Sequence, residues 1–192
     1  MASLVLSGDT SGSITVSAPA VAGSTTQTLV ATSGTLAPLV SGTSITLTNQ
    51  TAPEFTAIPS WVKRITLMFQ GVSTNSTGAP LIQLGTGSSP TYTTSGYLGA
   101  SSSMDAAVGT TSYTTGFGVR SLLAANVLHG NIIIANVTGN VWSASGNIAW
   151  SNSAAMAITA GSVSLAATLT AVRLFIDGTQ QFDAGTINIL YE

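Results

Sequence analysis

Apolar side chains alternate with hydroxyl side chains along many short segments of this sequence, and this period of two residues most constrains the fold. In "KRITLMFQ", the residues Ile65, Leu67 and Phe69 fall on one side of an extended chain, opposite Arg64 and Gln70. Alternate side chains of a strand point to opposite faces, whereas a helix needs apolar residues three or four apart. Half-buried strands are therefore predicted. The residues predicted to share a face in the other segments are Ile14 and Val16, Ile45 and Leu47, Val172, Leu174 and Ile176, and Ile187, Ile189 and Tyr191.

Breaks rich in Gly, Pro and Ser separate these segments, such as "NSTGAP", "GTGSSP" and "IDGTQ". Short strands with a turn every ~8–12 residues predict an all-β fold, an antiparallel sandwich of jelly-roll-like type. "DGTQQFD" (Asp177–Asp183) is interpreted as a hairpin whose Asp-Gly supplies a positive φ. Only Ser121–His129 is predicted to form a short helix, because helix-favouring Glu and Lys hardly occur.

Charged residues make up 5% of the 192 residues, and the formal net charge is -2. Ordinary soluble proteins carry about 25% charged residues, so here Ser, Thr, Asn and Gly must hydrate the surface. Copies of such a protein repel one another weakly, and this weak repulsion indicates a protein that assembles with other chains. The mean hydropathy is +0.46, but every apolar run is shorter than the ~20 residues of a membrane-spanning helix. The N-terminal sequence predicts no secretory signal peptide.

Composition changes near Thr51–Pro59, since aromatic residues begin only at Phe55. Residues 1–52 are therefore predicted to be an extended N-terminal β arm for attachment and assembly, because so few large side chains bury little area by themselves. Residues 53–192 are predicted to be the sandwich domain. On this division, a fragment without residues 1–50 is expected to fold.

The residues needed for catalysis or metal binding are sparse. Cysteine is absent and His129 is the single histidine, so multi-histidine and thiolate metal sites are excluded. No close carboxylate pair and no nucleophile motif occurs, and we expect a non-enzymatic protein without cofactor or metal. The basic residues are too few for a nucleic-acid surface; they are Lys63, Arg64, Arg120 and Arg173. The carboxylates are Asp9, Glu54, Asp105, Asp177, Asp183 and Glu192.

Aromatic residues offer one binding hypothesis. A sugar-binding platform pairs aromatic ring faces with hydrogen-bonding groups, whereas core and interface packing is the alternative use of the same residues. The glycan or receptor contacts that we consider are Tyr92, Tyr97 and Tyr113, which lie in polar, loop-like sequence. The other aromatic residues that such a platform would use are Trp61, Trp142 and Trp150.

Several segments carry a family resemblance. "IPSWVKRITLMFQGVSTNSTG", followed by "LIQLGTG" and "TSGY", and the C-terminal "FDAGTINILYE" resemble a domain of tailed-bacteriophage virion proteins, especially those of the tail-fibre type. The N-terminal "SGDTSGSITVSAPAVAGSTTQTL" resembles arms found in such proteins. The resemblance implies an antiparallel β-sandwich, a homotrimer, an arm that contacts neighbouring chains, and no catalytic residues.

Three functions remain open from the sequence. The first is a virion structural protein, a tail-fibre-type component that contributes to assembly and host attachment, made in the host cytoplasm and located in the phage particle. Its partners would be copies of itself, other virion proteins and a host surface glycan, with no nucleic acid and no membrane insertion. The second is a capsid decoration protein that stabilises the phage head. The third is a carbohydrate-binding module.

Overall fold

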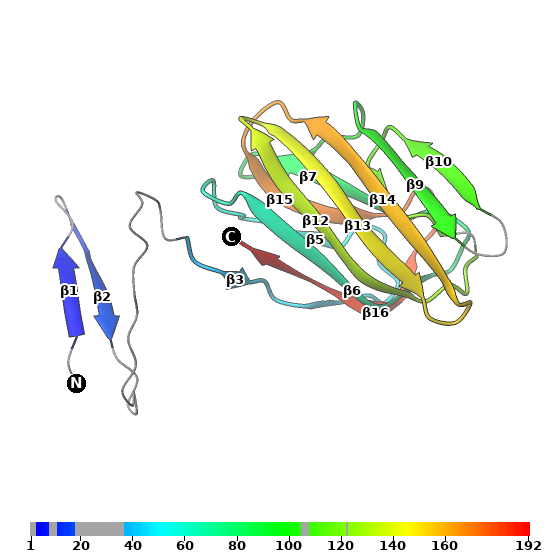
Figure 1. Cartoon of the computed structure of the whole chain (residues 1–192), viewed down its shortest axis with the longest axis horizontal. Helices are drawn as coiled ribbons and strands as arrows, with labels where there is room; N and C mark the ends of the chain where they lie inside the picture. Colours follow the sequence, from blue (N-terminus) through cyan, green and yellow to red (C-terminus); the bar gives the residue numbers. More distant parts are fainter. Residues whose placement is uncertain (1–2, 8–10, 18–36, 105–107, 122) are drawn as a thin grey trace. The chain divides into compact units, whose positions relative to one another are not determined.

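The computed structural model describes residues 3–7, 11–17, 37–104, 108–121 and 123–192 of the chain. All regular structure in these residues is β-strand, and every strand pair is antiparallel (Figure 1). The all-β class predicted from the alternation is confirmed. The chain divides into two compact units, Met1–Leu36 and Ala37–Glu192. No helix in the described ranges is long and apolar enough to cross a membrane.

The described part of the first unit is a β-hairpin of β1 (Ser3–Ser7) and β2 (Ser13–Ser17) (Figure 1). Its register pairs Leu4 with Val16. Four of its apolar side chains are more than half exposed, at 53% to 60%; they are Leu4, Val5, Leu6 and Val16. The predicted extended arm includes residues 18–36, which lie outside the described residues.

The larger unit contains a nine-stranded sheet, called here the wide sheet, in the order β10-β9-β14-β13-β12-β6-β16-β3, with β4 also paired to β16. Its strands are β3 (Val40–Ser41), β4 (Ile45–Thr46), β6 (Arg64–Thr74), β9 (Leu98–Met104), β10 (Gly109–Tyr113), β12 (Leu128–Thr138), β13 (Val141–Trp150), β14 (Ala155–Ser164) and β16 (Phe182–Tyr191).

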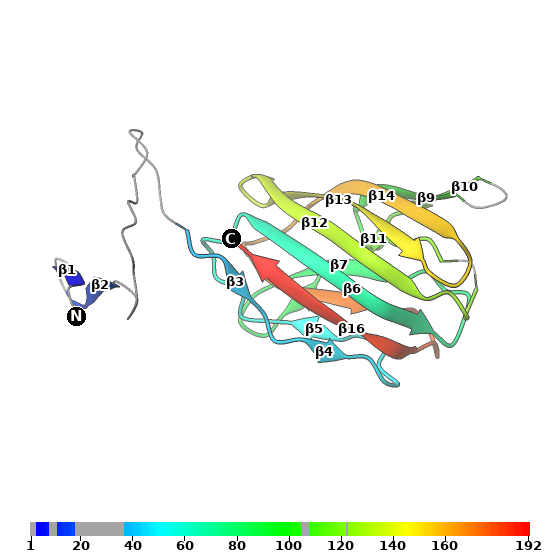
Figure 2. The same cartoon turned by 60° about the horizontal axis from the view of Figure 1, so that its bottom comes forward.

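A five-stranded sheet, called here the narrow sheet, lies behind the wide sheet in Figure 1. Its order is β11-β7-β15-β5, and β8 also pairs with β7. Its strands are β5 (Glu54–Phe55), β7 (Leu81–Thr86), β8 (Thr91–Tyr92), β11 (Phe117–Gly118) and β15 (Leu169–Phe175). Figure 2 shows β4 and β5 along the same long edge of the sandwich.

The core lies between the two sheets, where the period-two pattern places it. On β6, the residues Ile65, Leu67 and Phe69 are buried, while Arg64 and Gln70 are exposed. The other inward sets of the larger unit are also buried, except that Ile45 and Tyr191 are partly buried and pack against the core; the buried ones are Leu47, Val172, Leu174, Ile176, Ile187 and Ile189. Burial of these side chains supplies the main favourable free energy of folding.

The domain boundary predicted after residue 52 differs from that of the structure. The larger unit begins at Ala37. Both β3 and β4 pair with β16, and Leu47 is fully buried. Edge strands pair through backbone groups, so residues 40–46 join the sandwich although this segment has few large side chains. The scarcity of large side chains was the reason for predicting an arm up to residue 52.

Two further predictions need correction. The described residues of Ser121–His129 form no helix, because Leu128 and His129 already begin β12 and Asn126 hydrogen-bonds to the Ser121 hydroxyl instead. Asp177–Asp183 is a turn with Gly178 at φ 73°, as predicted. However, it connects β15 of the narrow sheet to β16 of the wide sheet, so it is not a hairpin. The jelly-roll-like connectivity stays a prediction.

Candidate binding and interaction surfaces

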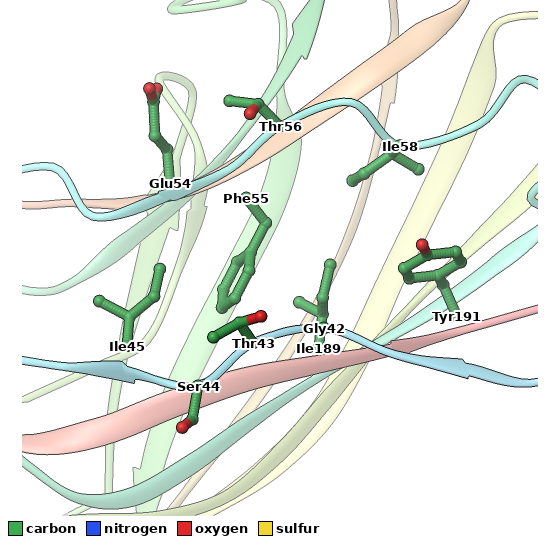
Figure 3. A pocket seen from close by; sticks show the side chains of 10 residues that line it. All are labelled: Gly42, Thr43, Ser44, Ile45, Glu54, Phe55, Thr56, Ile58, Ile189 and Tyr191. Atoms are coloured by element: carbon green, nitrogen blue, oxygen red, sulfur yellow. The ribbon is translucent and has the colours of Figure 1, made fainter.

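A pocket of about 320 Å³ opens at the edge where β4 and β5 approach each other (Figure 3). The side chains of Ile45, Phe55, Ile58, Ile189 and Tyr191 point into the space between the segments, whereas those of Ser44, Glu54 and Thr56 point away. The pocket therefore offers an apolar interior with a polar rim, which suits an apolar group of a ligand or partner. The remaining lining residues are Gly42, Thr43, Ser44, Glu54 and Thr56.

Tyr92 lies on the outer side of the narrow sheet. Its hydroxyl donates a 2.7 Å hydrogen bond to Oε2 of Glu54, and the guanidinium carbon of Arg173 is 4.1 Å from its ring centroid. Gly85 faces the ring, and a Cβ at this position would lie 2.9 Å from Cε1 of Tyr92. Partial burial, and then the hydrogen bond and charge of Glu54, raise the pKa of Tyr92 well above its usual range.

Arg173 joins this tyrosine to the rest of the narrow sheet. Its guanidinium carbon is also 4.8 Å from the ring centroid of Phe175, and its Nε donates to Gln83. The side-chain amide of Gln83 in turn donates to the carbonyl oxygen of Thr115. Both rings stabilise the cation. Sequence reasoning missed Arg173, although the alternation in "AVRLFID" places it opposite the inward-facing residues.

Tyr97 is a core residue, so its prediction as a glycan contact is wrong. The side chain is fully buried and packs edge-to-face on Phe117, with ring centroids 4.9 Å apart. Its hydroxyl oxygen accepts a 2.9 Å hydrogen bond from the backbone N–H of Leu84. Burial raises the pKa of Tyr97 to about 12. Tyr97 is therefore part of the core, although its neighbours in the sequence are polar.

Tyr113 ends β10 on the edge of the wide sheet and is half-buried. Its ring occupies the space that a side chain at Gly118 would fill. Burial raises the pKa of Tyr113, and the positive charge of Arg120 opposes that rise. The three predicted tyrosines therefore lie on the narrow sheet, in the core and on the wide sheet, and they form no common platform.

The tryptophans also differ from the predicted platform. Trp61 is 40% exposed, and its ring centroid is 6.0 Å from that of Tyr191. Trp142 and Trp150 are buried, at 4% and 3% exposed. The indole N–H of each has no hydrogen-bond acceptor among the described residues. Trp142 and Trp150 pack in the core, and Trp61 is the one tryptophan of the three that is exposed to solvent.

The ionisable residues are spread over the larger unit. Nδ1 of His129 accepts a 3.3 Å hydrogen bond from the backbone of Gly71. Glu192 pairs with Arg64, and Asp183 accepts a hydrogen bond from Ser73. Asp9 and Asp105 lie outside the described residues. Within the described ranges, no group of three or more histidines and carboxylates is placed to hold a metal ion.

The outer surface of the wide sheet carries two adjacent rows of side chains, one from β10 to β3 and the other from β10 to β16. Neighbours in each row are paired by the strand register, and none is buried. We call these two rows the wide face. The first row is Ser112, Ala100, Ala160, Ser145, Ile133, Thr66, Leu190 and Ser41; the second is Thr110, Ser102, Ile158, Asn147, Asn131, Met68 and Asn188.

No residue of the wide face is charged, and its largest exposed apolar side chains are Ile133 at 40% and Ile158 at 43% exposed. Hydroxyl and amide groups beside them can donate and accept hydrogen bonds. Such a surface suits contact with another protein, because its burial leaves no unpaired charge.

Comparison with known proteins found no family model, no curated protein and no solved structure that matches this chain.

Proposed function

We propose that this chain is a structural protein of a bacteriophage virion, a tail-fibre-type component that acts through contacts with other chains and catalyses no reaction. The resemblance of "IPSWVKRITLMFQGVSTNSTG" and "FDAGTINILYE" to tail-fibre-type domains is the sequence support for this proposal. In this role the chain assembles as a homotrimer, contacts other virion proteins and contributes to host attachment.

The wide face is the observation that carries the proposal. Soluble proteins avoid large uncharged surfaces, because charges keep copies apart and hydrated. Here two rows across a nine-stranded sheet have no charge, and Ile133 and Ile158 project from their centre. Burial of these side chains against another chain would remove apolar area from water, and the neighbouring Asn and Ser side chains would supply directional hydrogen bonds.

The location in the particle separates the tail role from the alternative of capsid decoration. Purified virions labelled with gold-conjugated antibodies against the larger unit should carry gold at the tail or its fibres. Gold distributed over the head would overturn the tail assignment and favour decoration. Absence of the protein from washed virions, measured by mass spectrometry, would overturn both roles.

A carbohydrate-binding role is the third candidate, and it rests on Tyr92 with Arg173. The half-buried ring and cation lie together on the outer side of the narrow sheet. A Tyr92→Ala variant should lose glycan binding on an array, whereas a Tyr97→Phe variant should keep it because Tyr97 is buried. An array without any signal for the unaltered protein would exclude this role.

A further inference from the structure

The turn between β15 and β16 contains the one dipeptide of the chain in which an Asp or Asn precedes a Gly. This dipeptide is Asp177-Gly178, and every other Asp and Asn precedes a residue that has a side chain. The backbone nitrogen that follows an Asp can attack the side-chain carboxyl carbon. A glycine hinders this attack least, because it has no Cβ and its backbone is permissive. Asp177 is therefore the position at which the sequence favours a rearrangement of the main chain.

The structure places the two reacting groups next to each other. The backbone N–H of Gly178 donates a 2.8 Å hydrogen bond to Oδ1 of Asp177. Oδ1 is bonded to Cγ, so the nitrogen lies beside the carbon that it would attack. Reacting atoms that are held ~3–3.5 Å apart need little further ordering to react. The carboxyl of Asp177 has no other hydrogen-bond partner among the described residues, so no second contact opposes its rotation toward the nitrogen.

The surroundings of the dipeptide leave room for the change. Asp177 and Gly178 are both exposed. Gly178 has a φ of 73°, and a Cβ at this position would meet no other atom within 4 Å. Water can therefore reach the carboxyl, and a ring can form there without displacing a core side chain.

Asp183 is a natural comparison within the same segment. It is also exposed, but it lies in β16 and its carboxylate accepts a hydrogen bond from the hydroxyl of Ser73. The next residue is Ala184, which has a Cβ and is paired with Ser73 in the strand register. Both its carboxylate and the nitrogen that follows it are thus held by the sheet, unlike those of Asp177.

We propose that Asp177 is a site of spontaneous modification, at which the aspartyl residue becomes an isoaspartyl residue. The nitrogen of Gly178 loses its proton and bonds to Cγ of Asp177, the Cγ–OH bond breaks, and one water leaves to give a succinimide. One water then opens this ring. Cleavage between Cγ and nitrogen restores aspartate, whereas cleavage between the backbone carbonyl carbon and nitrogen gives isoaspartate. The net reaction changes no mass and needs only water, and it does not rest on the assembly role proposed above.

The modification should loosen a contact between two loops. The backbone N–H of Asn75, in the loop after β6, donates a 3.0 Å hydrogen bond to the carbonyl oxygen of Gln181. The N–H of Gln181 in turn donates a 2.9 Å hydrogen bond to Oδ1 of Asn75, and the side chains of Ser76 and Gln180 also hydrogen-bond. Isoaspartate adds one carbon to the main chain at Asp177. The longer turn should therefore move Gln180 and Gln181 away from these partners.

Incubation of the full chain in mildly acidic buffer at physiological temperature, followed by trypsin digestion, tests the site. Cleavage after Arg173 releases residues 174–192, a single peptide that contains both Asp177 and Asp183. Electron-transfer fragmentation distinguishes isoaspartate from aspartate, because isoaspartate has an additional carbon–carbon bond in the main chain. Isoaspartate should accumulate at Asp177 at least roughly tenfold faster than at Asp183.

Three results of this incubation would overturn the proposal. They are equal accumulation at the two positions, no isoaspartate at Asp177, and isoaspartate at Asp177 in the urea-unfolded chain but not in the folded chain. The third result would show that the folded turn protects the peptide bond instead of presenting it.

Two exposed variants assign the reaction to Asp177. Asp177→Glu keeps the carboxyl but adds a methylene, so the ring would need six atoms instead of five, and the modification should be lost. Asp183→Glu makes the same change in β16 and should leave the rate at Asp177 unchanged. A rate that is unaffected by Asp177→Glu, or equally slowed by both changes, would contradict the assignment.

Hydrogen exchange of the modified chain tests the structural consequence. The backbone N–H groups of Asn75 and Gln181 should exchange at least roughly tenfold faster than in freshly purified protein. The N–H of Leu174, which donates to the carbonyl oxygen of Pro53, should keep its rate. Unchanged exchange at Asn75 and Gln181 would overturn the predicted loosening. Equal acceleration at Leu174 would show general unfolding and would overturn it as well.

Discussion

The hydroxyl of Tyr92 donates a 2.7 Å hydrogen bond to the carboxylate of Glu54, and this contact ties β8 to β5 on the narrow sheet. Since a two-residue strand such as β5 has few backbone bonds, side-chain contacts must help to hold it in place. Arg173, opposite Glu54 in the register, completes the arrangement by contacting the Tyr92 ring.

Tyr92→Phe should lower the free energy of unfolding by about 1 kcal/mol, because it removes a hydrogen bond to a charged but exposed group. Urea denaturation measures the change. Tyr191→Phe is the matched control, since the Tyr191 hydroxyl forms no hydrogen bond with the described residues. Equal losses in both variants would show that the Glu54 contact contributes nothing.

Alkaline pH should destabilise the protein through Tyr97. The pKa of Tyr97 in the folded chain is about 12, whereas the pKa of a tyrosine in the unfolded chain is about 10. Between these values the folded chain holds more protons, so the free energy of unfolding falls as pH rises. The contribution is complete below about pH 10 and is lost as pH rises toward about 12, with a size on the order of 3 kcal/mol.

Tyr97→Phe is the variant that isolates this effect. It should show a shallower decline of stability above about pH 10 than the unaltered protein. It should also lose about 1–3 kcal/mol at neutral pH, because the backbone N–H of Leu84 is left without its acceptor. Parallel pH profiles for the two proteins would contradict the assignment to Tyr97.

Leu67→Asp should unfold the larger unit. Leu67 is fully buried in β6 at the centre of the wide sheet, and an unpaired charge there costs several kcal/mol. Thr66→Asp places the same charge on the outer side of the same strand and should leave the circular dichroism spectrum unchanged. A folded Leu67→Asp protein would show that the core assignment is wrong.

Truncation tests the boundary between the two units. A fragment of residues 37–192 should fold and unfold cooperatively, because it contains the whole larger unit. A fragment that starts at residue 51 lacks β3, β4 and Leu47, and it should be less stable by about 2–5 kcal/mol. Equal melting temperatures for the two fragments would support the boundary predicted at residue 52.

Sequence patterns predicted the fold class and most of the core, because the period of two is a local property of each strand. Ile65, Leu67 and Phe69 are buried as the alternation requires. Patterns could not place Tyr97, because its burial depends on the backbone of Leu84 in β7 and the ring of Phe117 in β11. The pairing of residues 40–46 with β16 was missed for the same reason, since strand pairing joins residues far apart in sequence.

The candidate sites were predicted less well than the fold. Tyr92 was identified as a polar-loop tyrosine, but its partners Glu54 and Arg173 become visible only through the register of β5 with β15. The wide face could not be predicted from the sequence either, because each strand supplies at most one residue to each row. Its lack of charge is nevertheless a direct consequence of the 5% charged composition.

Light scattering of the full chain measures whether the wide face joins copies of the protein. The unaltered chain should have about three times the monomer mass of 19.2 kDa, and an Ile133→Lys/Ile158→Lys variant should fall to the monomer mass with the same circular dichroism spectrum. Leu123→Lys, which changes an exposed apolar residue in the loop before β12, should remain a trimer. A monomeric unaltered chain, or a trimer that survives both wide-face lysines, would contradict assembly through this face.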